Sequence, residues 1–228
     1  RRRSIVRSKP PRHGRARRST PGGRHDPYNY RRFRGDLRTS TCPRRRTVRR
    51  AERAARRSAQ PMTIRRLALP DVHAYRALML EAYERDADAY TSSAAERAAL
   101  PLAWWESRLA NAPQAPEIVI GAFEDGRLAG AAGLSFEPRE KARHKATLFG
   151  MYVHPAARRR GLGRQLVREA LAQAKARSGV ILVQLTATEG NAAARSLYER
   201  CGFVAFGVEP LAMAVGNAYL GKVHMWCD

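Results

Sequence analysis

The sequence predicts an α+β fold in which helices flank a sheet of mixed strand directions. Strand-like and helix-like runs follow one another in the order β, α, α, β, β, β, α, β, α, β, β. An Asp125-Gly126 turn joins two of the strand-like runs, which predicts an antiparallel hairpin. Farther on, a strand, a helix and a second strand span residues 146–186, and this succession predicts a crossover between parallel strands. Both strand directions are therefore expected in one sheet.

The N-terminal part of the fold is expected to contain one strand and then helices. Residues 62–67 form the strand, and Pro70-Asp71 opens a helix. Apolar side chains recur in this helix at helical spacing, at Val72, Tyr75, Leu78, Met79 and Ala82. Ser93 with Glu96 resembles a capping signal for a second helix. A further helix holds Trp104 and Trp105 and ends before Pro113.

The C-terminal part carries the remaining strands and two helices. Strands are expected at residues 117–123, 127–136 and 146–153, with a charged loop at 137–145 and a stop at Pro155. Residues 162–177 form the clearest helix, with one apolar stripe at Leu162, Leu166, Val167, Ala170, Leu171 and Ala174. A strand at 180–186 follows. Asn191 caps the last helix, which ends at Gly202, and strands at 203–208 and 219–226 complete the fold.

Charge divides the chain into two parts. Residues 1–60 hold 22 of the 43 basic residues and three of the 20 acidic ones, so they carry +19 of the net charge of +23. Their aliphatic side chains larger than alanine are only Ile5, Val6, Leu37 and Val48. So few apolar groups cannot offset the entropy of ordering sixty residues. We expect an Arg-rich disordered extension at residues 1–61 and a nearly neutral globular domain at residues 62–228.

Three interpretations of the basic extension compete. A basic arm could bind nucleic acid or acidic lipid headgroups, and an organellar targeting sequence would also be rich in arginine. In the third interpretation, which we expect, the native protein starts at Met62, the first methionine in the sequence. Nucleic acid is then a partner only if the extension is native.

Cysteine usage and hydropathy indicate a cytoplasmic protein. The three cysteines, Cys42, Cys201 and Cys227, are widely spaced and form no C-x-x-C pair, so we expect free thiols and no metal site. No apolar run approaches the ~20 residues that span a bilayer. No membrane partner is expected, and a homodimer is compatible with the sequence.

A loop of basic residues and glycines precedes the helix at 162–177. Its sequence is Arg158, Arg159, Arg160, Gly161, Leu162 and Gly163. Unpaired amides and the positive dipole end of a helix attract anions, and glycines let the backbone approach a phosphate. A dinucleotide fingerprint would need a third glycine, and a P-loop would need Gly-Lys-Ser/Thr. The loop predicts a pyrophosphate site, with a solvated basic turn as the alternative.

Two segments resemble a known family. Residues 151–166, Met-Tyr-Val-His-Pro-x-x-Arg-Arg-Arg-Gly-Leu-Gly-Arg-x-Leu, resemble motif A of the GNAT superfamily of N-acetyltransferases. Residues 191–203, Asn-Ala-Ala-Ala-Arg-Ser-Leu-Tyr-Glu-Arg-Cys-Gly-Phe, resemble its motif B. Their order and spacing match those of bacterial members across residues 62–228. The resemblance implies a GNAT-like, mostly antiparallel sheet with a central V-shaped splay, and acetyl transfer from acetyl-CoA to a primary amine without a metal.

The resemblance also assigns roles to individual residues. Amides of the loop would hold the pyrophosphate, the backbone around Met151 and Val153 would pair with the pantetheine arm, and Gly150 would form the bulge that splays two strands. Asn191 would contact acetyl-CoA near the thioester, with an ordinary helix cap as the alternative. Tyr198 would protonate the departing thiolate, with core packing as the alternative. The implied acetyl-CoA-binding residues are Met151, Tyr152, Val153, Arg158, Arg159, Arg160, Gly161, Leu162, Gly163, Arg164, Asn191 and Tyr198.

The general base and the acceptor stay open. Glu137 and His144 are candidate catalytic bases because they border the expected cleft; solvated loop residues or a water relay are the alternatives. Tyr83, Trp104 and Trp105 are candidates for the acceptor side or for the core. The acceptor is a small-molecule or peptide amine that no pattern identifies. Two other functions compete: a nucleic-acid-binding protein that uses the basic arm, and a non-catalytic CoA-binding domain.

Overall fold

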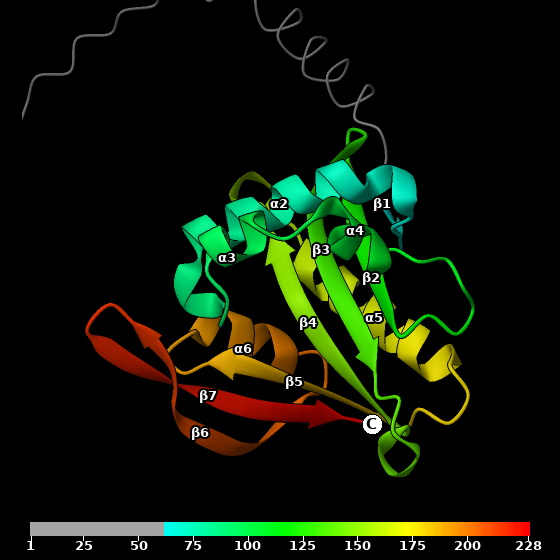
Figure 1. Cartoon of the computed structure of the whole chain (residues 1–228). Coiled ribbons are helices and arrows are strands. Elements are labelled where there is room, and N and C mark those ends of the chain that lie inside the picture. The colour runs from blue at the N-terminus through cyan, green and yellow to red at the C-terminus, as the bar shows by residue number, and fades with distance from the viewer. Residues whose placement is uncertain (1–61) are drawn as a thin grey trace, which may run out of the picture. The chain divides into compact units, whose positions relative to one another are not determined.

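A seven-stranded mixed sheet forms the centre of the fold. The structure is a computed structural model that describes residues 62–228, so the expected Arg-rich extension lies outside the described residues. Figure 1 shows the sheet, whose strand order is β1-β2-β3-β4-β5-β7-β6. β4 and β5 run parallel, and every other neighbouring pair runs antiparallel. The expected α+β fold with a mostly antiparallel sheet is confirmed.

The elements follow the predicted order, except that three helices instead of two lie between the first and second strands. The strands are β1 (Thr63–Arg66), β2 (Glu117–Glu124), β3 (Arg127–Phe136), β4 (Lys145–Val153), β5 (Leu182–Thr188), β6 (Val204–Val215) and β7 (Ala218–Cys227). The helices are α2 (Val72–Arg85), α3 (Ala94–Ala98), α4 (Leu102–Ser107), α5 (Leu162–Ala176) and α6 (Ala192–Glu199). Short 3-10 turns include η1 (Leu69–Asp71), η2 (Ala87–Ala89), η3 (Glu140–Ala142) and η4 (Pro155–Ala157).

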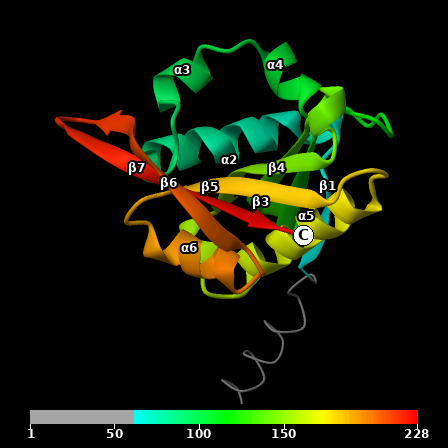
Figure 2. The same ribbon diagram turned by 90° about the horizontal axis from the view of Figure 1, so that it is seen from below.

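Helices cover both faces of the sheet. Figure 2 shows α2, α3 and α4 on one side of the strands and α5 and α6 on the other. The apolar stripe of α5 is buried against the sheet, together with residues of β2, β3 and β4. The apolar residues of α2 form a second cluster with Trp105, Leu109 and Tyr152. The two predicted amphipathic helices therefore pack on opposite faces.

The β2–β3 hairpin turns at the predicted position. Asp125 and Gly126 both have positive φ, 49° and 75°, and Glu124 pairs with Arg127 across the turn. Two residues in the left-handed region are typical of the type I′ turn, whose twist matches that of the flanking strands. The Asp-Gly signal therefore predicted the strand direction and the register next to the turn, and the register shifts farther along, between Ala122 and Phe123.

β4 and β5 separate partway along their length. They pair only at Lys145↔Leu182, Ala146↔Val183 and Thr147↔Gln184, and Figure 1 shows them diverging beyond that point. Gly150 has φ +57°, and the β3–β4 register shifts opposite it. A bulge of this kind bends its strand. The V-shaped splay is thus present in the middle of the sheet.

The predicted end of the strand at residue 208 was wrong. β6 continues to Val215, through Pro210. Proline is tolerated because β6 is an edge strand with one hydrogen-bonding partner. The pairing with β7 shifts between Glu209 and Met213, and Leu211 has φ +54°. The irregularity at Pro210 therefore bends the strand instead of ending it.

Cysteines and membrane spans were also part of the sequence prediction. Cys201 and Cys227 carry free thiols, and Cys42 lies outside the described residues. Within residues 62–228, no helix has the length and apolar character needed to cross a bilayer. In the same range, no cluster of His, Cys, Asp and Glu side chains could hold a metal ion.

Candidate functional site

A cleft of about 930 Å³ opens where β4 and β5 diverge. Its walls come from β4, β5, the start of α5, α6, and the segment that runs from the end of α2 to α4. Of the residues expected to bind acetyl-CoA, all but Arg160 line this cleft. Segments far apart in the sequence thus meet at the break in the sheet.

The N-terminus of α5 presents unpaired amides to the cleft. Its N-cap is Gly161, which has no side chain to cap the helix. The first backbone hydrogen bond of the helix runs from Gln165 N to Gly161 O at 3.1 Å, so the amides of Leu162, Gly163 and Arg164 precede the helical ladder. These donors and the helix dipole favour an anionic ligand.

The two glycines of the loop serve different purposes. Gly161 has φ +83°, a left-handed conformation that side chains with a Cβ rarely adopt. Gly163 lies under α6, where an added Cβ would come within 3.1 Å of Leu197 Cδ2. The turn therefore favours glycine at position 161, whereas a larger residue at position 163 would require the Leu197 side chain of α6 to shift.

The arginines of the loop point in different directions. Arg158 donates from Nε to the Val153 carbonyl at 2.8 Å, and its Nη2 pairs with Asp86 Oδ2 at 2.5 Å. Arg159, with φ 62°, lines the cleft. The side chain of Arg160 instead forms an ion pair with Glu124 at the β2–β3 turn. The structure therefore brings Arg158 and Arg159, but not the Arg160 side chain, to the cleft.

The end of β4 turns backbone groups toward the cleft. His154 N–H binds the Ala129 carbonyl on the β3 side at 2.8 Å, so alternation along the strand directs the polar groups of Val153 away from β3. The Met151 carbonyl accepts a hydrogen bond from the Tyr90 hydroxyl at 2.9 Å. Burial raises the pKa of Tyr90, so this hydroxyl stays a donor. Sequence reasoning missed Tyr90, which lies in a loop without periodicity.

Asn191 and Tyr198 enter the cleft from α6 and the loop before it. Asn191 Oδ1 accepts from Ala194 N at 3.0 Å, which confirms the predicted helix cap. Tyr198 is 7% exposed and packs edge-on against Phe203. Burial raises the pKa of Tyr198 to about 12. Among the described residues, no hydrogen-bond partner is found for its hydroxyl.

Glu137 and His144 lie outside the cleft lining. Arg139 holds Glu137 at 2.7 Å and lowers its pKa. The His144 carbonyl accepts from the amides of Ile181 and Leu182, at the end where β4 and β5 still pair. Both residues are therefore at the closed end of the V.

The aromatic candidates divide between the cleft and the core. Tyr83 lines the cleft, whereas Trp105 is 1% exposed in the core. Trp104 packs against Trp105 without lining the cleft. Arg97, Arg108 and Lys222 also line the cleft. Sequence reasoning missed the two arginines because no local pattern relates α3 and α4 to the middle of β4.

Comparison with known families agrees with this geometry. The model of the acetyltransferase (GNAT) family matches residues 75–203, more than half of the chain. The chain belongs to this family. The matched region runs from α2 to the end of the α6 segment and so includes the loop, the splayed strands and most of the cleft.

Relatives and solved structures extend the comparison. The [ribosomal protein bS18]-alanine N-acetyltransferase of Salmonella typhimurium is 44% identical over 59 residues, which is 26% of this chain and 39% of that protein. A GNAT-family acetyltransferase from Streptococcus pneumoniae shares the fold, with a TM-score of 0.66, 24% identity, and coverage of 73% of this chain and 98% of that one. The putative acetyltransferase yncA from Salmonella typhimurium was solved with its cofactor acetyl-CoA. It has a TM-score of 0.62 and 25% identity, and the match covers 74% of this chain and 94% of that one.

Proposed function

We propose that this chain transfers an acetyl group from acetyl-CoA to a primary amine. One observation carries the proposal: the uncapped amides of α5 and the free side of β4 open into the same cleft. An anion-binding helix end beside an unpaired strand suits a ligand with a pyrophosphate and a slender amide-containing arm. Family membership and the relative solved with acetyl-CoA support the same conclusion.

The residues of the cleft fit the two ends of acetyl-CoA. The amides that follow Arg158 would bind the pyrophosphate, with Arg158, Arg159 and Arg164 supplying positive charge. The backbone of Val153 and Met151 would bind the pantetheine amides. When bound, acetyl-CoA supplies an electrophilic thioester carbonyl and a thiolate leaving group. Fixed backbone donors on β4 would stabilise the charge that develops on the carbonyl oxygen.

Tyr198 is our proposed general acid. Its hydroxyl lines the cleft without a hydrogen-bond partner among residues 62–228, and its pKa of about 12 keeps it protonated at neutral pH. A protonated group beside the sulfur can deliver its proton as the carbon–sulfur bond breaks. Asn191, whose Oδ1 is used by the helix cap, would contribute through its remaining amide donors.

Water is our proposed acceptor of the amine proton. In the described part of the chain, the one carboxylate that lines the cleft belongs to Asp86, and Arg158 holds it. Glu137 and His144 lie at the closed end of the V, away from this lining. A relay of water through the open cleft therefore fits the geometry better than either side chain. The free thiols of Cys201 and Cys227 support our placement of the reaction in the reducing cytoplasm.

Ligand-induced thermal stabilisation of the full chain tests the donor. Acetyl-CoA at about 100 times its Kd should stabilise the fold by about 2.7 kcal/mol, which raises the Tm by roughly 5–10 °C. Adenosine, which lacks the pyrophosphate and the pantetheine arm, is the control and should give a much smaller shift. An unchanged Tm with acetyl-CoA would contradict the proposal. A shift without CoA release for any amine would instead favour a non-catalytic CoA-binding domain.

A further inference from the structure

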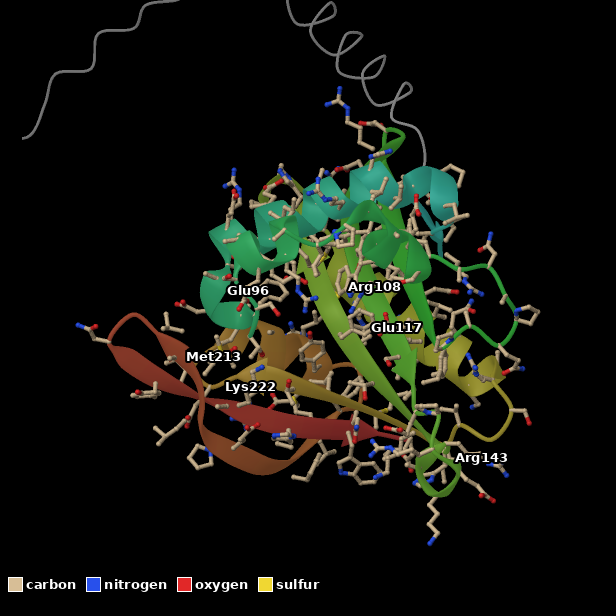
Figure 3. All side chains as sticks on the ribbon, in the orientation of Figure 1. Glu96, Arg108, Glu117, Arg143, Met213 and Lys222 are labelled. Atoms are coloured by element: carbon tan, nitrogen blue, oxygen red, sulfur yellow. The ribbon has the colours of Figure 1, made fainter. Side chains whose placement is uncertain are left out.

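The cleft has a second group of cationic side chains, separate from the loop. Arg97 at the end of α3, Arg108 just after α4 and Lys222 on β7 all line it. Figure 3 labels Arg108, which lies close to β3 and β4, and Lys222, which lies on the other arm of the V. Among the described lining residues, the only carboxylate is Asp86, which pairs with Arg158 of the loop. This part of the cleft is therefore positively charged.

Contacts along β4 place Arg108 beyond the reach of the pyrophosphate. Val153 binds Arg158 of the loop, Met151 binds Tyr90, and the Arg108 guanidinium lies 4.8 Å from the centre of the Phe149 ring. Phe149 precedes Val153 by four positions, which corresponds to about 13 Å of strand at ~3.3 Å per residue, shortened by the bulge. Arg108 therefore lies beside β4 well away from the loop, toward the end of the strand where the thioester and the acceptor would meet.

Arg97 and Arg108 are held in place by one aromatic ring. Their guanidinium carbons lie 4.7 and 4.1 Å from the centre of the Trp104 ring. Stacking of this kind fixes the plane of a guanidinium before a ligand arrives. The pair is therefore organised in advance, as a recognition site requires.

The positive charge of this pair is only partly compensated. Arg108 Nε lies 3.4 Å from Glu117 Oε2, and Figure 3 shows the two residues side by side. Arg97 forms no ion pair within residues 62–228. The Nε atoms of both arginines are buried without a hydrogen-bond partner. Both residues line the cleft, so their incompletely balanced charge favours an anionic ligand there.

We propose that Arg97 and Arg108 bind a carboxylate of the acceptor, so that the substrate is a small amino acid or an analogue with an equivalent oxyanion. This inference rests on the proposed acetyl transfer. A guanidinium binds a carboxylate through two parallel hydrogen bonds, which would leave the neighbouring amine directed along β4 toward the thioester. Amines of high positive charge would be repelled by Arg97, Arg108 and Lys222.

Matched pairs of amines test the substrate class in the full chain. Methionine is compared with methionine amide, and leucine with isopentylamine, by release of free CoA. We expect kcat/KM to be at least about ten-fold higher for the amine that carries a free carboxylate than for its matched partner. A difference of this size corresponds to the loss of one hydrogen bond to a charged group. The amine of methionine amide loses its proton more readily than that of methionine, so amine basicity cannot produce a preference for methionine over its amide, and this pair decides the test. Equal or higher kcat/KM for methionine amide, or for a peptide amine, would overturn the inference.

Charge-removing variants locate the site. Arg97→Gln and Arg108→Gln should each raise KM for methionine about ten-fold or more and leave KM for acetyl-CoA unchanged. If the Arg108→Gln variant is unstable, Arg108→Lys replaces it, because lysine keeps the positive charge. This variant should lose part of the preference for a carboxylate. Arg143→Gln changes an arginine outside the cleft lining, labelled in Figure 3, and should leave both constants unchanged. A variant that lowers kcat/KM equally for methionine and its amide contradicts the assignment.

A binding measurement separates this inference from the proposed function. Methionine should raise the Tm of the CoA-loaded chain, and the Arg97→Gln variant should lose that shift. If acetyl-CoA raises the Tm but methionine does not, the proposed substrate class is wrong and the proposed acetyl donor is retained. Failure of acetyl-CoA to stabilise the chain would remove the proposed function and this inference together.

Discussion

Tyr198 illustrates how one side chain can serve both the core and the cleft. Its ring packs with Phe203 and is almost fully buried, yet its hydroxyl lines the cleft without a protein partner among the described residues. A buried tyrosine hydroxyl ordinarily finds a hydrogen-bond partner. The Tyr198 hydroxyl is not among the buried side-chain atoms that lack a partner, so it is accessible to solvent or to a ligand in the cleft.

Replacement of Tyr198 by phenylalanine tests this role. Tyr198→Phe should lower kcat by about 10²–10⁴-fold, the contribution of a positioned general acid, because the ring stays while the proton donor is lost. Free-CoA release at saturating substrates measures the effect. Tyr219→Phe removes the hydroxyl of a tyrosine that is 67% exposed and lies outside the cleft lining, and should leave kcat unchanged. An unaltered kcat in Tyr198→Phe would rule it out as an essential acid.

At the residue scale, local patterns predicted part of the candidate site. The loop and α6 are continuous in sequence, so glycine spacing and capping residues brought Arg158, Gly161 and Asn191 to attention. The side-chain direction of Arg160 could not be predicted, because its partner Glu124 belongs to a distant hairpin. The same holds for Arg97 and Arg108, which reach the cleft only through tertiary packing.

At the element scale, the course of β4 decides the shape of the cleft. The bulge at Gly150 lets Leu148 and Met151 contact the cluster around α5, while Tyr152 belongs to the cluster around α2. If the residues of β4 alternated regularly without a bulge, Tyr152 would lie on the same face as Leu148. The bulge thus lets β4 bury side chains in both apolar clusters, and it bends β4 away from β5.

Substitutions at two glycines distinguish the role of the β4 bulge in forming the cleft from the general cost of backbone strain. Gly150 (φ +57°) and Gly126 (φ +75°) are both left-handed, and an added Cβ has no contact within 4 Å at Gly126 and only Met79 Cε, at 3.7 Å, at Gly150. Alanine at either position should therefore lower the free energy of unfolding by about 1–2 kcal/mol, as measured by urea unfolding. Only Gly150→Ala should also raise KM for acetyl-CoA. An equal rise in Gly126→Ala would contradict a specific role for the bulge.

Most elements were predictable because their signals are local. Caps, turns and apolar periodicity lie within a few residues of the element they define, as for Asn191 and the Asp125-Gly126 turn. The length of β6 was not predictable in this way. Pro210 ends a central strand but not an edge strand, and the position of a strand within a sheet depends on the whole topology.

At the scale of the whole molecule, buried tyrosines link stability to alkaline pH. Burial raises the pKa of Tyr75 and of Tyr198 to about 12, and also raises that of Tyr90. In the unfolded chain these groups titrate near 10. Between about pH 10 and pH 12 the unfolded state therefore releases protons that the folded state keeps. Their contribution to stability is complete below about pH 10 and is lost as the pH rises through this window.

Unfolding experiments over this range test the linkage. The free energy of unfolding should fall by up to about 2 kcal/mol for each buried tyrosine as the pH rises from about 10 to about 12. Urea unfolding followed by circular dichroism measures it, with tyrosinate absorbance as a second signal. Tyr75→Phe should show a shallower loss. The prediction fails if tyrosinate absorbance of the folded chain develops fully near pH 10.

The gap between β4 and β5 also bears on how the chain avoids aggregation. Unpaired backbone groups along a strand can recruit strands of other molecules. Here the free side of β4 lies within the sheet, and Thr188 on β5 is joined to Asp88 by a 2.7 Å hydrogen bond, while Lys222 on β7 contacts Thr91. These two contacts tie the far arm of the V to the segment that follows α2. The side chains of an added polypeptide strand would clash with these two contacts, whereas a thin, unbranched arm could pass between β4 and β5. The closed walls of the cleft therefore disfavour strand pairing between copies of the protein.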